Sequence, residues 1–125
     1  MHTKAEHTGK CALVLEGGSF RSQFTAGVID VMLERGIEVP ACYGVSAGAL
    51  IGLNYKSRQI GRANRVNLAF CNDRRYIGAK SLTTTGSLIG YDFMLNDVQD
   101  RLGPFDNEAF LANPMRLYAT VTDIL

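Results

Sequence analysis

Patterns typical of strands and helices alternate from the start of the chain to about residue 55, and this alternation restricts the fold more than any other feature. Residues 10–16 (KCALVLE) form a short apolar run followed by two glycines, which is typical of a buried strand that ends in a turn. Residues 23–35 have apolar side chains at helical spacing, residues 39–45 resemble a second buried strand, and a second helix is expected over about 47–55. Strands separated by a helix pair in parallel through a right-handed crossover, so we predict an α/β fold with a parallel sheet.

The first predicted helix has signals at both of its ends. Ser22 precedes it as a candidate N-cap, and Gly36 follows it as a residue suited to the left-handed turn that ends many helices. The residues that recur at helical spacing between these ends are Phe24, Gly27, Val28, Val31 and Met32.

The second half of the chain gives weaker signals. Residues 61–70 and 92–102 have patterns typical of helices, whereas residues 79–90 combine turn signals with β-branched side chains and are expected to form a loop. Asp106 is positioned to cap a short helix through Phe110 that ends before Pro114. The last residues, 115–125, alternate in the manner of a third strand. No internal repeat or low-complexity linker interrupts these elements.

The charge balance excludes some classes of partner. The 125 residues have a net charge of +1, which gives no indication of nucleic-acid binding. Basic residues nevertheless collect between positions 56 and 80, where Asp73 is the sole acidic residue. A solvated helix face is the ordinary explanation of such a stretch. Attraction to anionic lipid head groups, as a peripheral membrane contact, is the alternative.

The cysteines and the N-terminal residues bear on the compartment. Cys11, Cys42 and Cys71 have no metal-type spacing, and the first two lie in apolar runs, so we expect free thiols, buried at Cys11 and Cys42, in a reducing compartment. Residues 1–9 form a polar leader without the apolar core of a signal peptide, and no apolar run approaches the roughly 20 residues that span a bilayer. We therefore expect a soluble, cytoplasmic protein without a bound metal or cofactor.

Ser46 stands between two glycines in the segment ACYGVSAGAL (41–50), where a predicted strand passes into a predicted helix. In a nucleophile elbow the serine occupies a tight strand-to-helix turn, and the residues two before and two after it must be small. Gly44 and Gly48 occupy these positions. The N–H of Ala47 would then donate to an oxyanion at the helix N-terminus. The alternative is a small-residue helix start in which Ser46 is merely the N-cap.

A second glycine-rich segment, EGGSFRS (16–22), also lies between a predicted strand and a predicted helix. Gly17, Gly18 and Ser19 are placed to turn their N–H groups toward one point, an arrangement that binds anions. Because the ends of neighbouring parallel strands open onto the same crevice, we expect this loop beside Ser46 as a source of oxyanion donors. The segment lacks the patterns of a dinucleotide site and of a P-loop. A plain glycine turn is the alternative.

A catalytic triad around Ser46 would need a histidine later in the chain. The chain has only His2 and His7, both in the polar leader. Either the base is an aspartate in a Ser–Asp dyad, or the histidine belongs to a part of the protein that this chain does not include.

In combination, Gly-Gly-x-x-Arg after the first strand, the helix FTAGVIDVMLERG and the segment GVSAGAL resemble the patatin-like phospholipase family, in particular its longer bacterial members. The resemblance runs from about Lys10 to the C-terminus. It implies a parallel-sheet, three-layer fold that is incomplete here, with residues 10–125 as the N-terminal part of the domain. It also implies Ser46 as nucleophile, Arg21 as a positioning arginine, and Gly17, Gly18 and Ser19 as the oxyanion loop.

The chain departs from the family pattern at three points. Ser19 and Ser22 stand where the family commonly has glycine, and no aspartate is followed by glycine, although the family's dyad aspartate lies in an Asp-Gly motif. We therefore expect a serine lipid acyl hydrolase, of phospholipase A or esterase type, whose base aspartate is missing from this chain and which is inactive as this chain alone. Its substrate would be a lipid or acyl ester. A non-catalytic fragment or interaction module, and an acyltransferase that uses the same serine, stay open as alternatives. The oligomeric state is not indicated.

Overall fold

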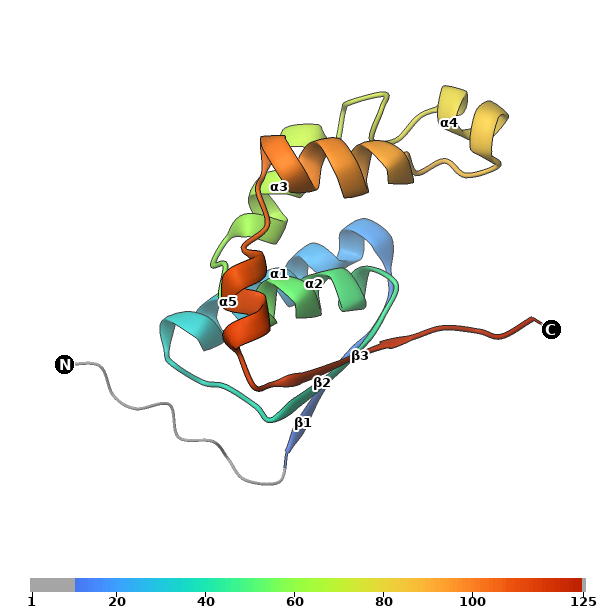
Figure 1. Ribbon diagram of the computed structural model, residues 1–125. Helices are drawn as coiled ribbons and strands as arrows, with labels where there is room; N and C mark the ends of the chain where they lie inside the picture. Colours follow the sequence, from blue (N-terminus) through green and yellow to red (C-terminus); the bar gives the residue numbers. More distant parts are fainter. Residues whose placement is uncertain (1–10, 125) are drawn as a thin grey trace. The chain divides into compact units, whose positions relative to one another are not determined.

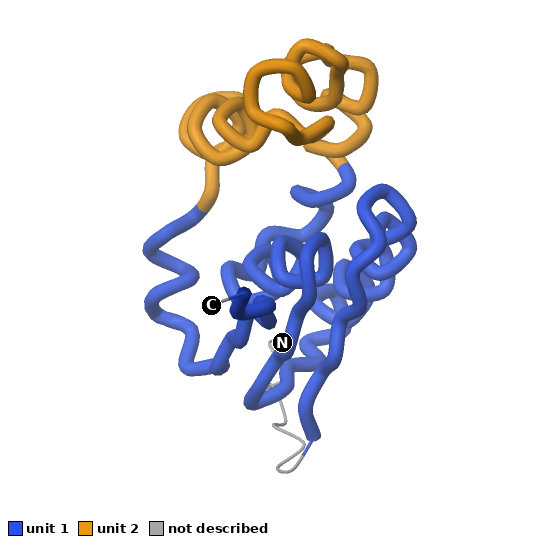
Figure 2. Tube along the Cα trace, turned by 90° about the vertical axis from the view of Figure 1, so that its right-hand side faces the viewer, with its two compact units in different colours: residues 1–64, 106–125 blue, residues 65–105 orange. Residues whose placement is uncertain are grey.

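Residues 11–124, the part of the chain that the computed structural model describes, fall into two units (Figure 1 and Figure 2). The first unit consists of the residues up to Asn64 together with those from Asp106 onward, and the second consists of Arg65 to Phe105. The predicted polar leader and both histidines lie outside the described residues.

A sheet of three parallel strands organises the first unit. β1 (Ala12–Leu15) and β3 (Arg116–Thr120) flank the central strand β2 (Ala41–Val45), so the order in space follows the order in the chain. Both pairs of neighbouring strands are parallel. The α/β fold with a parallel sheet, and the third strand near the C-terminus, are therefore confirmed.

The helices of the first unit cover one face of this sheet. A short 3₁₀ turn, η1 (Ser19–Ser22), leads into α1 (Gln23–Glu34), and α2 (Ala47–Lys56) follows β2 directly; both α-helices lie on the same side of the strands in Figure 1. Side chains from the strands and helices meet there in one core, which consists of Leu15, Ala26, Ile29, Val39, Cys42, Ile51, Tyr55 and Met115. Burying each large apolar side chain in such a core contributes about 1.5–3 kcal/mol to stability.

The opposite face of the sheet is open. Val14, Tyr43 and Tyr118 stand in register on neighbouring strands and are all exposed, as is Val45. The rings of Tyr43 and Tyr118 stack with centroids 4.6 Å apart and planes within 10° of parallel. Among the described residues of the first unit no helix covers this face, although parallel sheets are ordinarily covered on both sides.

The ends of α1 agree with the sequence in part. Gly36 has φ 66°, the left-handed conformation expected of a residue that ends a helix. Ser22 stands at the N-cap position, but its side chain makes no capping hydrogen bond and is buried, so the predicted cap is wrong. The helix instead continues from η1, whose 3₁₀ turn already engages the backbone before α1 begins.

Of the apolar residues noted at helical spacing in α1, Met32 packs against the core, whereas Phe24, Val28 and Val31 are exposed. Phe24 is 81% exposed and Val31 52%, whereas Ala26 and Ile29 are buried. The face of α1 that packs into the core is therefore the one that carries Ala26 and Ile29.

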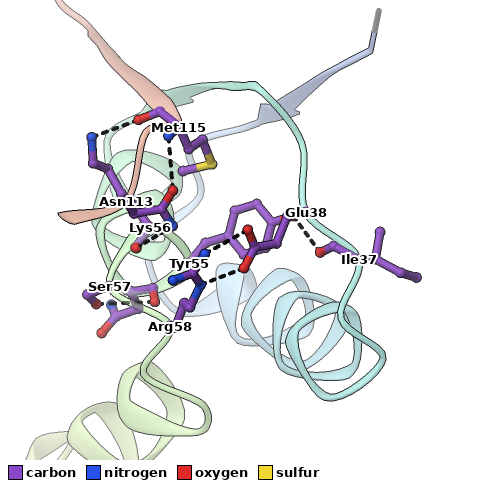
Figure 3. Close-up of polar contacts among 9 residues, drawn as sticks. Ile37, Glu38, Tyr55, Lys56, Ser57, Arg58, Asn113 and Met115 are labelled. Carbon is purple, nitrogen blue, oxygen red and sulfur yellow. Dashed lines mark hydrogen bonds and ion pairs between the residues drawn. The ribbon is translucent and has the colours of Figure 1, made fainter. Parts of the chain in front are cut away.

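The C-terminal end of α2 is fixed by polar contacts to two other segments of the first unit (Figure 3). The Lys56 ammonium donates to the carbonyl of Met115 (2.7 Å), and the buried Asn113 amide donates to the carbonyl of Lys56 (2.8 Å). On the other side, the Tyr55 hydroxyl donates to the carbonyl of Ile37 (2.8 Å), and Arg58 forms a two-pronged ion pair with Glu38. These contacts hold the helix whose first turn begins at Ser46.

The second unit is helical. α3 (Arg62–Phe70) begins in the first unit and continues into the second, followed by α4 (Ala79–Thr85) and the π-helix η2 (Phe93–Leu102). The helices expected over 61–70 and 92–102 are confirmed, but the loop expected over 79–90 is wrong for its first seven residues, which form α4. In the first unit, α5 (Asn107–Ala112) is capped as predicted, because the Asp106 carboxylate accepts from the N–H of Ala109 (2.8 Å).

The cysteines differ sharply in environment. All three are free. Cys42 is fully buried in the core, and this burial raises the pKa of its thiol to about 11. Cys11 was also expected to be buried, but it precedes β1 and is exposed, as is Cys71. Among residues 11–124, no helix is both long enough and apolar enough to cross a bilayer.

Candidate active site

Ser46 occupies the corner between β2 and α2, and its backbone is strained there. Its φ of 51° and ψ of −124° lie in a region that residues with a side chain rarely adopt, at a cost of order 1–3 kcal/mol. The side chain is exposed and makes no capping hydrogen bond to the helix. Ser46 therefore stands at the N-cap position of α2 without capping the helix through its side chain, on a tight strand-to-helix corner.

The glycines on either side of Ser46 are required by close backbone packing. A Cβ atom placed on Gly44 would lie 2.5 Å from the Cα of Ala49, within the first turn of α2. One placed on Gly48 would overlap the carbonyl oxygen of Leu15 at the end of β1. Gly44 thus lets the strand fold tightly onto the helix, and Gly48 lets the helix approach the neighbouring strand.

The glycine-rich loop after β1 lies directly against the Ser46 corner. A Cβ atom on Gly17 would be 3.2 Å from the Cβ of Ser46 and 3.2 Å from the carbonyl oxygen of Val45. This contact follows from the sheet, because β1 and β2 are parallel neighbours whose C-terminal ends meet at one edge. The expectation that the two loops converge is therefore met at Gly17.

Four backbone donors near this corner have no acceptor within residues 11–124. They are the N–H groups of Gly17, Gly18, Ser19 and Ala47. The last of these is the first residue of α2, where the helix dipole adds partial positive charge. Groups of this kind stabilise a developing negative charge when they are aimed at it.

Arg21 and the two serines at which the chain departs from the family pattern, Ser19 and Ser22, have different conformations. The Arg21 side chain is exposed and folds back over Gly18, so that a Cβ on that glycine would lie 3.2 Å from the Nη2 atom. Ser19 has φ 51°, which explains why glycine would suit its position, whereas Ser22 has φ −68° and needs no glycine.

We predict that Ser19→Gly stabilises the protein by about 1 kcal/mol, because glycine removes the penalty of a left-handed residue with a side chain. The matched variant Ser22→Gly should destabilise it by at least about 0.5–1 kcal/mol, since Ser22 already has helical angles. Urea unfolding followed by circular dichroism measures both. A Ser19→Gly protein no more stable than Ser22→Gly would show that the φ of Ser19 carries no strain.

Within the described residues, no carboxylate or imidazole forms a hydrogen bond with the Ser46 hydroxyl. Four aspartates make contacts elsewhere: Asp30 accepts from the N–H of Gly61, Asp73 pairs with Arg75, Asp97 pairs with Arg101, and Asp106 caps α5. No group of His, Cys, Asp and Glu side chains in residues 11–124 is arranged to hold a metal ion. The structure adds no base that sequence reasoning overlooked.

The fold and this corner define the class of protein: a parallel α/β protein with a serine at a strained strand-to-helix turn. The family model described as patatin-like phospholipase matches residues 13–122, which is most of the chain. The chain belongs to this family, and the family is one of lipid hydrolases.

One relative among curated proteins is the uncharacterized protein YjjU of Escherichia coli (strain K12), which is 33% identical over 88 residues. The aligned region covers 70% of this chain but 25% of YjjU, so the chain spans about a quarter of that relative. No solved structure matches the chain significantly.

Proposed function

We propose that this chain supplies the nucleophile of a serine lipid acyl hydrolase of the phospholipase A or esterase type. The observation that carries the proposal is the exposed Ser46 hydroxyl on a strained corner, with unengaged N–H groups from two loops beside it. Membership of the patatin-like phospholipase family supports a lipid ester as the substrate.

In the proposed reaction, the Ser46 oxygen attacks the carbonyl carbon of an acyl ester while its proton passes to a base. The carbonyl oxygen becomes an oxyanion, which accepts hydrogen bonds from the N–H of Ala47 and from the loop of Gly17, Gly18 and Ser19. The alcohol then leaves with a proton, and the fatty acyl group stays on Ser46. Water hydrolyses this acyl-enzyme and releases the fatty acid. Each such donor is worth on the order of 10²–10³ in rate.

We assign Arg21 to positioning the oxyanion loop. Its guanidinium folds over Gly18, and it has no ion-pair partner within residues 11–124. A side chain in this place restricts how the loop can move without itself touching the reacting ester.

The base of the proposed dyad is an aspartate that we place outside these 125 residues. None of the aspartates in the chain is followed by glycine, and the aligned part of the chain covers 25% of YjjU. A longer protein would therefore have room for an Asp-Gly motif. The sequence of the gene beyond the segment that encodes this chain would show whether it contains that motif.

A fluorophosphonate probe tests the assignment of the nucleophile, because it bonds covalently to activated serines. In the intact protein we expect one adduct, located by peptide mass spectrometry on Ser46, and none in Ser46→Ala. Ser87→Ala, which changes a serine of the second unit, is the matched control and should label fully. Labelling that survives in Ser46→Ala would remove Ser46 from the mechanism.

A further inference from the structure

The second unit contains a segment with a concentrated positive charge, residues 74–91, which we call the basic loop. It carries Arg74, Arg75 and Lys80, and no acidic residue occurs between Asp73 and Asp92. Arg75 is already engaged, since it pairs with Asp73 at 2.8 Å and lies over the ring of Phe93 at 4.4 Å. Arg74 and Lys80 are exposed and have no ion-pair partner within residues 11–124, so their charge is available to an external anion.

The same loop exposes large apolar side chains next to these cations. Leu82 is 46% exposed, Leu88 54% and Tyr91 50%. Leucine beside lysine and arginine is the composition of segments that lie in the interfacial zone of an anionic membrane, and tyrosine is enriched at that depth. Moving an exposed leucine side chain from water into the acyl chains is favourable, because its apolar surface leaves water.

The three threonine hydroxyls of the basic loop already donate to carbonyls within it. The hydroxyls of Thr83 and Thr84 donate to the carbonyl of Lys80 at 2.9 Å, and that of Thr85 donates to the carbonyl of Ser81 at 2.8 Å. Because these hydroxyls do not depend on water, moving α4 into a less polar layer carries a smaller desolvation penalty.

The base of the loop is held in a fixed shape. Ile77 and Ile89 form an antiparallel bridge, and the N–H groups of Gly78 and Gly90 donate to the carbonyls of Leu88 (3.1 Å) and Tyr76 (2.9 Å). A loop that is closed at its base presents its cations and leucines without first having to order itself on binding.

We propose that the basic loop docks the protein onto anionic lipid bilayers, with Arg74 and Lys80 at the head groups and Leu82 and Leu88 toward the acyl chains. Each cation near such a surface strengthens binding about fivefold. The inference names a partner for the proposed lipid hydrolase, but vesicle binding does not require Ser46, so the two proposals can fail separately.

Sedimentation with vesicles tests the proposal, using the intact protein with Ser46→Ala so that no lipid is consumed. The protein should bind phosphatidylcholine vesicles that contain phosphatidylserine, bind pure phosphatidylcholine vesicles far more weakly, and dissociate as salt is added. The double variant Arg74→Gln/Lys80→Gln should lose about 25-fold in affinity, which is the product of two fivefold effects. Leu82→Ser/Leu88→Ser should lose binding without losing the salt dependence of what remains.

The matched controls lie in the first unit. Leu111→Ser removes a leucine of α5 that is 79% exposed, and Arg116→Gln removes an exposed cation of β3. Both should leave vesicle binding unchanged. Equal binding to both kinds of vesicle, no binding to either, or an equal loss in the controls would overturn the proposal. Circular dichroism of each variant checks that the loop changes leave the fold intact.

Discussion

Ser46→Ala is expected to lower ester hydrolysis by the intact protein by a factor on the order of 10⁴–10⁶, because the acyl-enzyme can no longer form. The residual rate would come from substrate binding and from the backbone donors of Gly17 and Ala47, which the substitution leaves in place. Hydrolysis of a p-nitrophenyl ester measures the loss. The 125-residue chain by itself should show no turnover that depends on Ser46, since it lacks the proposed aspartate.

Ser46→Gly separates the chemical role of the hydroxyl from the strain of the corner. It should be as inactive as Ser46→Ala, but more stable than the parent protein by about 1–3 kcal/mol, because glycine adopts φ 51°, ψ −124° without penalty. A stability gain that accompanies a loss of activity is typical of a strained catalytic residue. Turnover in either variant within tenfold of the parent would exclude Ser46 as the nucleophile. Turnover by the chain alone would place the base inside it.

Gly48→Ala is expected to destabilise the protein by about 3 kcal/mol or more, which is at the upper end for a single added methyl group. The new Cβ would overlap the carbonyl oxygen of Leu15 and lie 2.6 Å from that of Glu16. Both are backbone atoms of one strand end, so neither can rotate away. The helix would have to retreat from β1, and the contact between Gly17 and Ser46 would open with it. The midpoint of urea unfolding measures the effect.

Gly27→Ala is the matched control, because it adds the same methyl group to a helix where nothing lies within 4 Å of the new atom. It should stabilise the protein by about 0.5–1 kcal/mol through the lower flexibility of alanine in the unfolded chain. A Gly48→Ala protein within about 0.5 kcal/mol of Gly27→Ala would mean that α2 and β1 are not packed as described.

The elements around the candidate site could be predicted because local signals and tertiary packing agree there. The apolar runs of β1 and β2 suit buried strands, Gly36 supplies the left-handed residue that ends α1, and Gly44 and Gly48 leave room for close backbone contacts around Ser46. What the sequence could not give was the stripe of α1 that meets the sheet. Phe24 and Val28 are more apolar than Ala26, but small Ala26 allows the closer approach and is the buried residue.

The second unit was harder to predict for a different reason. In α4 the threonines have low helix propensity, but their hydroxyls bond to carbonyls three and four residues earlier, and Gly86 ends the helix at φ 74°. In η2 the buried residues Phe93 and Val98 are five apart, which suits the wider turn of a π-helix and not the ordinary helical spacing. This spacing of five residues is the sequence signal that could have indicated a π-helix at η2.

The burial of Cys42 gives the protein a built-in reporter of core opening. Its sulfur packs beneath α2, 3.4 Å from where a Cβ on Gly52 would lie, and a thiol with a pKa of about 11 is almost never the reactive thiolate at neutral pH. Cys11 and Cys71 are exposed and should be alkylated at once. The appearance of a further adduct with time therefore reports the opening of the core around Cys42, and its rate relative to that of an exposed cysteine gives the free energy of that opening.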